Sequence, residues 1–170
     1  MGSCCSSKSE KSLSSNQTVM CPSCQARAKA VGLTTLLHQV KAPLNQNLSD
    51  KAYFFCAQVD CDTVYFSLDG LCLNREQVRD SVGQKSADPE RTLCYCFNIT
   101  DTMVSDEIRQ TGTSSSKAFV VEQTKIKNCA CDIRNPSGRC CLRNFLNDRK
   151  TSIALKRRFR PPRRQRNNKQ

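Results

Sequence analysis

Residues 53–66 read Tyr-Phe-Phe-Cys-Ala-Gln-Val-Asp-Cys-Asp-Thr-Val-Tyr-Phe, two aromatic runs separated by a segment that begins and ends with cysteine. Aromatic and β-branched residues favour strands. We therefore expect a hairpin of residues 53–56 and 64–66 with the cysteines at its turn. The aromatic side chains would provide a small apolar backing for whatever the cysteines bind.

Upstream, residues 21–24 read Cys-Pro-Ser-Cys. The two pairs Cys21/Cys24 and Cys56/Cys61 supply four sulfurs, and structural zinc sites use four tetrahedral ligands of this kind. The pattern predicts a closed structural zinc site that contributes to folding. Two alternatives stay open: buried or disulfide-bonded cysteines, and the single histidine, His38, in place of one sulfur.

The composition agrees with a small metal-supported fold. The chain has 170 residues, 13 cysteines and no tryptophan, and 6% of its residues are aromatic. One domain or two small ones with a thin core are expected, and such cores are commonly supported by metal or disulfides. Residues 1–20 lack the apolar segment of a signal peptide, and no apolar run reaches the length of about 18 residues that spans a bilayer. We expect a cytoplasmic protein without a transmembrane segment rather than a secreted disulfide scaffold.

The chain divides into four parts by composition. We expect a disordered Ser-rich leader (1–19), a zinc-binding unit with its linker (20–92), a second unit (93–150) and a basic disordered tail (151–170). The last fifteen residues carry eight Lys and Arg and no acidic residue, so most of the net charge of +12 lies there. In the first parts we expect a short helix at 34–40, a strand at 77–82 and a loop at 86–90.

The second unit has clear helix signals. Thr100 is a good N-cap, and Gly112 is expected to end the helix that follows. Hydrophobic spacing predicts that the buried face of this helix comprises Met103, Val104 and Ile108. Ser114–Ser116 can cap a second helix, whose predicted buried face comprises Ala118, Val121 and Ile126. Residues 135–138, Asn-Pro-Ser-Gly, predict a tight turn. Helical spacing resumes at Cys141, Leu142, Phe145 and Leu146.

Six further cysteines lie in this unit as the pairs Cys94/Cys96, Cys129/Cys131 and Cys140/Cys141. Pairs with one intervening residue favour a two-iron cluster, because neighbouring sulfurs reach one iron with little strain. Iron–sulfur centres take four cysteine thiolates, although thiolates also suit copper(I) and zinc. The spacing leaves open which members of the last two pairs are ligands.

Two sets of motifs in the sequence resemble those of a known family. Residues 94–100 (Cys-Tyr-Cys-Phe-Asn-Ile-Thr), then Cys131, then residues 135–141 (Asn-Pro-Ser-Gly-Arg-Cys-Cys) are similar to the iron–sulfur domain of CopZ-type copper chaperones, which is akin to bacterioferritin-associated ferredoxin. Residues 21–24, 55–56 and 61–66 are similar to its zinc-binding part. The resemblance covers Cys21 to about Asn147.

The resemblance implies an α+β protein in which a zinc-binding β-hairpin unit is fused to a helical [2Fe–2S] domain. It implies Cys21, Cys24, Cys56 and Cys61 as zinc ligands. Its cluster ligands would be Cys94, Cys96, Cys131 and Cys141, with Cys129 and Cys140 as alternates. Family members also carry a C-terminal copper-binding domain with its own Cys-x-x-Cys, and here only the basic tail follows Asp148.

We therefore interpret the chain as a metallochaperone-like protein for copper or another soft metal, with a redox-active cluster that reduces Cu(II) to Cu(I). Its partners would be metal ions and either a metal transporter or an electron donor. A ferredoxin-like electron carrier or iron-release partner is one alternative. A zinc-binding nucleic-acid adaptor is another, disfavoured because the tail offers no aromatic platform beyond Phe159. No catalytic triad, phosphate-binding loop or paired-carboxylate site is present, so no enzyme activity is expected.

Three cysteines remain outside these sets. Cys4 and Cys5 form a vicinal pair that is suited to transient binding of Cu⁺, and residues 1–6 also fit an acylation pattern. Cys72 is expected to be a buried or free thiol.

Overall fold

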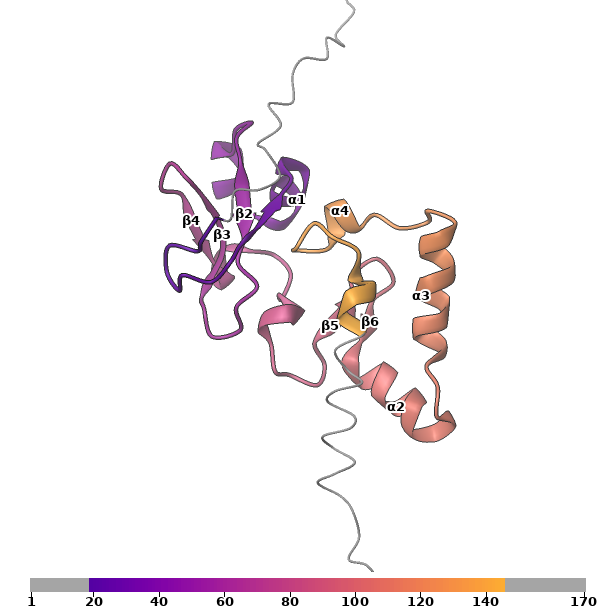
Figure 1. The fold of residues 1–170 in the computed structure, drawn as a ribbon. Helices are drawn as coiled ribbons and strands as arrows, with labels where there is room; N and C mark the ends of the chain where they lie inside the picture. The colour runs from indigo at the N-terminus through magenta and orange to yellow at the C-terminus, as the bar shows by residue number, and fades with distance from the viewer. Residues whose placement is uncertain (1–18, 146–170) are drawn as a thin grey trace, which may run out of the picture.

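The computed structural model describes residues 19–145, which form a sheet-containing half followed by a mainly helical half (Figure 1). The mixed helix and sheet class is as predicted. Four strands form one antiparallel sheet in chain order: β1 (Lys29–Val31), β2 (Tyr53–Phe55), β3 (Thr63–Ser67) and β4 (Cys72–Asn74). The predicted hairpin is confirmed by the pairing of Phe54 with Phe66 across β2 and β3.

Strands β2 and β3 are buried on both faces. Successive side chains of a strand point to opposite faces. Phe55 and Tyr65 therefore pack in the core that also contains Leu36, whereas Phe54 and Phe66 pack beside cysteines. The rings of Phe54 and Phe66 are stacked with centroids 5.5 Å apart. The uninterrupted aromatic runs of the sequence reflect this burial of both faces.

Short helical segments connect the strands and lead out of the sheet: α1 (Leu33–Gln39), η1 (Leu44–Asn47), η2 (Arg75–Gln77) and η3 (Gly83–Lys85). Helix α1 matches the helix predicted at 34–40. The strand predicted at 77–82 is wrong. Asn74 and Gln77 form a capping box that bends the chain into η2, and Val78 makes only an isolated bridge with Val40.

The second half contains a two-stranded sheet and three helices, followed by a short 3-10 turn: β5 (Thr92–Cys94), β6 (Ile99–Thr100), α2 (Asp101–Thr111), α3 (Ser115–Lys125), α4 (Cys131–Arg134) and η4 (Cys141–Arg143). The predicted caps are confirmed. The Thr100 hydroxyl accepts a hydrogen bond from the Met103 N–H, Gly112 ends α2 at φ 79°, and Ser114 caps α3.

The predicted buried faces of α2 and α3 are only partly correct. Val104 is buried as expected, but Met103 is exposed, and α3 buries Val120 rather than Val121. Ile126 lies after the last residue of α3 and is 65% exposed. Phe119 packs edge-to-face on Phe97 with ring centroids 5.1 Å apart. Phe119 itself is 45% exposed, so the buried face of α3 is the one on which Val120 lies.

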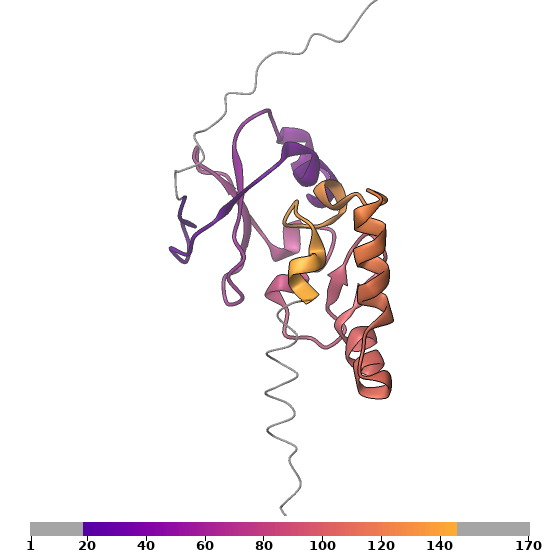
Figure 2. The ribbon, with the colours of Figure 1, turned by 45° about the vertical axis from the view of Figure 1, so that its right-hand side comes forward.

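The two halves meet where α1 packs against α4 (Figures 1 and 2). Polar side chains of the first half donate to backbone carbonyls of the second. The Thr35 hydroxyl donates to Asp132 O, the Gln39 amide to Arg134 O at 2.8 Å, and the Tyr65 hydroxyl to Pro136 O at 2.6 Å. These bonds fix the segment that contains Cys131 and the predicted tight turn, where the Gly138 N–H donates to Asn135 O.

The proposed boundary between units at residues 92 and 93 remains a prediction. None of the helices within residues 19–145 combines the length and apolar character needed to cross a membrane.

Candidate metal centres

The first cysteine set forms a compact four-sulfur group. The sulfurs of Cys21, Cys24, Cys56 and Cys61 all lie within 4.8 Å of one another. Cys21 and Cys61 are 3.9 Å apart, and Cys24 and Cys56 are 3.6 Å apart. A tetrahedral zinc ion with Zn–S distances of about 2.3 Å needs sulfurs about 3.8 Å apart. The donor set therefore fits zinc in both type and spacing.

Local backbone structure positions these sulfurs. The Cys21 N–H donates to Ala26 O, and the Gln25 N–H donates to Cys21 O with Gln25 at φ 56°, so residues 21–26 form a tight turn. Cys56 follows β2 directly, and its N–H donates to Val64 O of β3. The hairpin and the turn thus present two sulfurs each to the same point, beside the stacked Phe54 and Phe66.

The four thiols have different electrostatic surroundings. Burial raises the pKa of Cys56 to about 12 and also raises that of Cys61. Burial acts in the same direction on Cys21, but the N–H groups of Cys24 and Ser23 donate to its sulfur and lower its pKa to about 7. Backbone N–H groups directed at a sulfur stabilise the thiolate, the form that binds metal.

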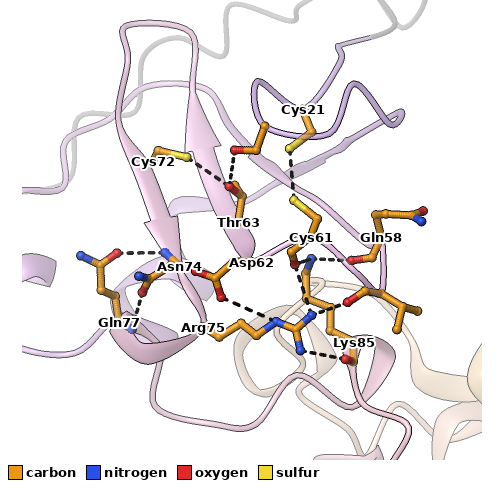
Figure 3. Close-up of polar contacts among 12 residues, drawn as sticks. Cys21, Gln58, Cys61, Asp62, Thr63, Cys72, Asn74, Arg75, Gln77 and Lys85 are labelled. Carbon is orange, nitrogen blue, oxygen red and sulfur yellow. Dashed lines mark hydrogen bonds and ion pairs between the residues drawn. The ribbon is translucent and has the colours of Figure 1, made fainter.

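Two cationic side chains hold the segment between Cys56 and Cys61 (Figure 3). Lys85 is 2% exposed, and its ammonium group donates to the carbonyls of Gln58 and Cys61. Arg75 donates to the carbonyls of Val59 and Cys61. Sequence patterns did not indicate either residue, because both lie outside the cysteine motifs in polar segments.

The remaining candidates for this site lie elsewhere. His38 is exposed on α1 and does not belong to the four-sulfur group. Cys72 is exposed, and its sulfur is 3.4 Å from the Thr63 hydroxyl, which in turn lies 2.7 Å from the Ser23 hydroxyl. Of the two states predicted for Cys72, the structure has the free, exposed thiol.

The second cysteine set comes together as two pairs. The sulfurs of Cys96 and Cys131 are 3.7 Å apart. The Cys141 thiol donates to the sulfur of Cys94, which is the main reason that the pKa of Cys94 is lowered to about 7 and that of Cys141 is raised. The pairs adjoin each other, because the charge of the Cys131 thiolate raises the pKa of Cys141, and the backbone N–H of Cys141 acts in the lowering direction on the pKa of Cys131.

The environments of the two pairs differ. Cys94 and Cys141 are buried in a core with Leu93, Ile99 and Val104. Cys96 is only half-buried, and its sulfur accepts a hydrogen bond from the N–H of Ala130. One pair therefore lies inside the core and the other at its edge.

Cys129 and Cys140 are less enclosed. Cys129 is half-buried and Cys140 is exposed. Within residues 19–145, the hydrogen bonds between cysteine sulfurs include neither Cys129 nor Cys140. The assignment of Cys94, Cys96, Cys131 and Cys141 as cluster ligands remains a prediction, as does zinc ligation by the first set. Cys4, Cys5 and the basic tail lie outside the described residues.

Comparisons with known proteins point to one family. Residues 18–79 match the family model of the CopZ zinc-binding domain. Copper chaperone CopZ of Archaeoglobus fulgidus is 30% identical to the chain over 122 residues, which cover 71% of this chain and 57% of that protein. The chain thus spans little more than half the length of this relative.

The fold agrees with the same relative. The X-ray structure of the Archaeoglobus fulgidus CopZ N-terminal domain is similar to this one with a TM-score of 0.64 and 26% sequence identity, over 78% of this chain and 98% of that one. The match to the family model includes all four sulfurs of the compact group. Residues 18–79 are therefore similar to a zinc-binding domain of the CopZ type, within a fold similar to that of the CopZ N-terminal domain.

Proposed function

We propose that the second half of the chain holds a [2Fe–2S] cluster through Cys94, Cys96, Cys131 and Cys141, next to a structural zinc ion held by the first cysteine set. The observation that carries the proposal is the arrangement of these four sulfurs in two adjoining pairs. A [2Fe–2S] cluster needs two cysteine sulfurs on each of two tetrahedral irons. The 3.7 Å between Cys96 and Cys131 suits two sulfurs on one such ion.

The surroundings support a redox role for this site. Hydrogen bonds from backbone N–H groups to the sulfurs and the degree of solvent exposure help to set the potential of an iron–sulfur centre. The sulfur of Cys96 accepts a hydrogen bond from the N–H of Ala130, and the N–H of Cys141 lies close enough to Cys131 to favour its thiolate. The half-buried Cys96 marks the side on which electrons would enter or leave, whereas Cys94 and Cys141 are enclosed by apolar side chains.

The proposed biological role is the handling of copper or another soft metal. The named relative is a copper chaperone, and similarity to it favours a metal carrier over an enzyme. A bound [2Fe–2S] cluster would supply one electron at a time, which matches the reduction of Cu²⁺ to Cu⁺. Thiolates bind Cu⁺ well, and Cys4 and Cys5 are proposed as transient ligands. A metal transporter or an electron donor would be the protein partner, in the cytoplasm.

An electron carrier without copper binding is the second candidate. The accessible Cys96 beside a buried pair is equally suited to electron transfer between proteins. A titration of the reduced protein with Cu⁺ against a competing chelator separates the two roles. Tight binding that is lost on changing Cys4 and Cys5 to serine supports the chaperone, and no tight binding supports the carrier. The nucleic-acid adaptor depends on the tail, so its affinity for nucleic acid should fall steeply with salt and vanish when residues 156–170 are removed. No binding of nucleic acid by the full chain at moderate salt would exclude it.

The cluster itself is tested by reconstitution with iron and sulfide under anaerobic conditions. We expect the absorption of a [2Fe–2S] centre and an EPR signal after reduction. Cys131→Ser should lose or strongly alter both, whereas Cys129→Ser, a matched substitution two residues away, should keep them. Equal loss in both variants would contradict the ligand assignment, and a wild-type protein without iron would contradict the cluster.

A further inference from the structure

The side chain of Lys85 is a buried cation without a carboxylate partner among the described residues. Its ammonium group donates to Gln58 O at 2.8 Å and to Cys61 O at 2.9 Å (Figure 3). Both carbonyls belong to the segment that carries Cys56 and Cys61. None of the ion pairs found within residues 19–145 involves Lys85. Because a buried charge is costly unless it is compensated, a negative charge is expected close by.

Arg75 contacts the same loop. It donates to the carbonyl of Cys61 at 3.3 Å and to that of Val59, and it also donates to the carbonyl of Lys85 at 2.9 Å. Its Nε lies 3.8 Å from a carboxylate oxygen of Asp62. Arg75 therefore links the loop between Cys56 and Cys61 to the backbone of Lys85.

Zinc ligation by the four cysteines would supply this negative charge. A Zn²⁺ ion with four thiolates carries a net charge of −2. We infer that Lys85 and Arg75 are the counter-ions of this zinc–thiolate centre, and that they hold zinc in place by fixing the Cys56–Cys61 loop and offsetting the thiolate charge. The inference rests on the zinc ligation proposed above. It implies that zinc is retained as a structural ion and is not the metal that the protein delivers.

The position of Lys85 is set from the second half of the molecule. Its segment η3 begins at Gly83, whose N–H donates to the Tyr95 hydroxyl at 2.8 Å; the same hydroxyl donates to Ser81 O at 2.7 Å. Tyr95 lies between Cys94 and Cys96. A Cβ at Gly83 would collide with the carbonyl of Thr92 in β5, so no larger residue fits this close approach. One short segment therefore contacts both the loop between Cys56 and Cys61 and Tyr95, the residue between two cysteines of the second set.

The test is the rate at which zinc passes from the protein to a chromogenic chelator such as 4-(2-pyridylazo)resorcinol. Lys85→Met keeps the length of the side chain and removes its charge. Loss of groups that support metal ligands typically weakens metal binding by about 10- to 100-fold, so we expect zinc release at least about tenfold faster. Lys85→Arg should release zinc at close to the wild-type rate. Lys51→Met removes a half-buried lysine that is paired with Asp69 and should leave the rate of zinc release unchanged.

Cobalt(II) substitution separates the charge effect from loosening of the loop. Without Lys85 the thiolate electrons lie at higher energy, so the sulfur-to-cobalt charge-transfer bands should move to longer wavelength while the d–d bands keep their tetrahedral pattern. Wild-type release kinetics in Lys85→Met, or a change in the d–d bands without that shift, would overturn the inference. If Lys85→Met does not fold, Arg75→Met at an exposed position carries the test, with faster release expected and an unchanged rate refuting it. Failure of the wild-type protein to bind zinc would instead refute the proposed zinc site.

Discussion

The Tyr65 hydroxyl is a buried connection between the two halves. Tyr65 is fully buried, and its hydroxyl donates to the buried carbonyl of Pro136 at 2.6 Å. Burial raises the pKa of this hydroxyl, so it remains a donor at all ordinary pH values. Tyr65→Phe removes only the oxygen and leaves the carbonyl without its donor. Such an unpaired buried group costs about 1–3 kcal/mol.

The free energy of unfolding is best measured by urea denaturation of the zinc-loaded protein. With a slope of about 1–3 kcal/mol per molar urea for a small protein, the midpoint should fall by roughly 1 M. The loss should also loosen the turn at residues 135–138. Hydrogen exchange of the Gly138 amide, which is bonded to Asn135 O, should therefore become faster.

Tyr53→Phe is the matched control. Its hydroxyl bonds the backbone of Ser49, an exposed residue of the same half. Water can replace these bonds, so the cost should be below about 1 kcal/mol. A Tyr65→Phe protein as stable as the wild type, or no less stable than Tyr53→Phe, would refute the role of this hydrogen bond in joining the halves.

Three further predictions concern local features. Gly138→Ala should destabilise the protein more than Gly112→Ala in thermal melts, because both residues have positive φ but only at Gly138 would a Cβ press against α1 and β1; equal costs would contradict this. Burial opposes ionisation of Glu107, but hydrogen bonds from the start of α3 lower its pKa from 4.5 to about 2. Its ionised form therefore stabilises the fold above pH 4.5, and the melting temperature of the wild type should exceed that of Glu107→Gln by less and less as the pH falls towards 2. At neutral pH the substitution should cost below about 1 kcal/mol, because solvent screens the carboxylate. A difference in melting temperature that does not change with pH would contradict this. Thr63→Val leaves the Ser23 hydroxyl without its 2.7 Å partner and should cost about 1 kcal/mol in urea denaturation, with faster zinc release; a neutral effect on both would show that this contact does not support the turn.

The elements that local sequence determines were predictable. Aromatic runs flanking Cys56 and Cys61 indicated the hairpin, and Thr100 and Gly112 indicated both ends of α2. The strand expected at 77–82 failed because Asn74, outside that window, closes a capping box with Gln77. The buried face of α3 was misplaced because hydrophobic spacing within the helix does not reveal which side faces the core, where Val120 packs with Cys141 and Phe145.

The candidate metal centres likewise combine features that the local sequence reveals with features that it does not. Cysteine spacing identified the members of both sets, but it did not show that Cys96 pairs with Cys131 or Cys94 with Cys141, because these contacts join residues far apart in the chain. Lys85 had no sequence signal. In a polar loop a lysine is normally solvated, and its burial depends on the carbonyl of Gln58, 27 residues earlier.

We propose that one chain holds two different metal centres. Zinc, iron and acid-labile sulfide should be counted in the full chain after anaerobic purification without added metal. We expect about one zinc, two irons and two sulfides per chain. Zinc in both sites, without iron or sulfide, would contradict it.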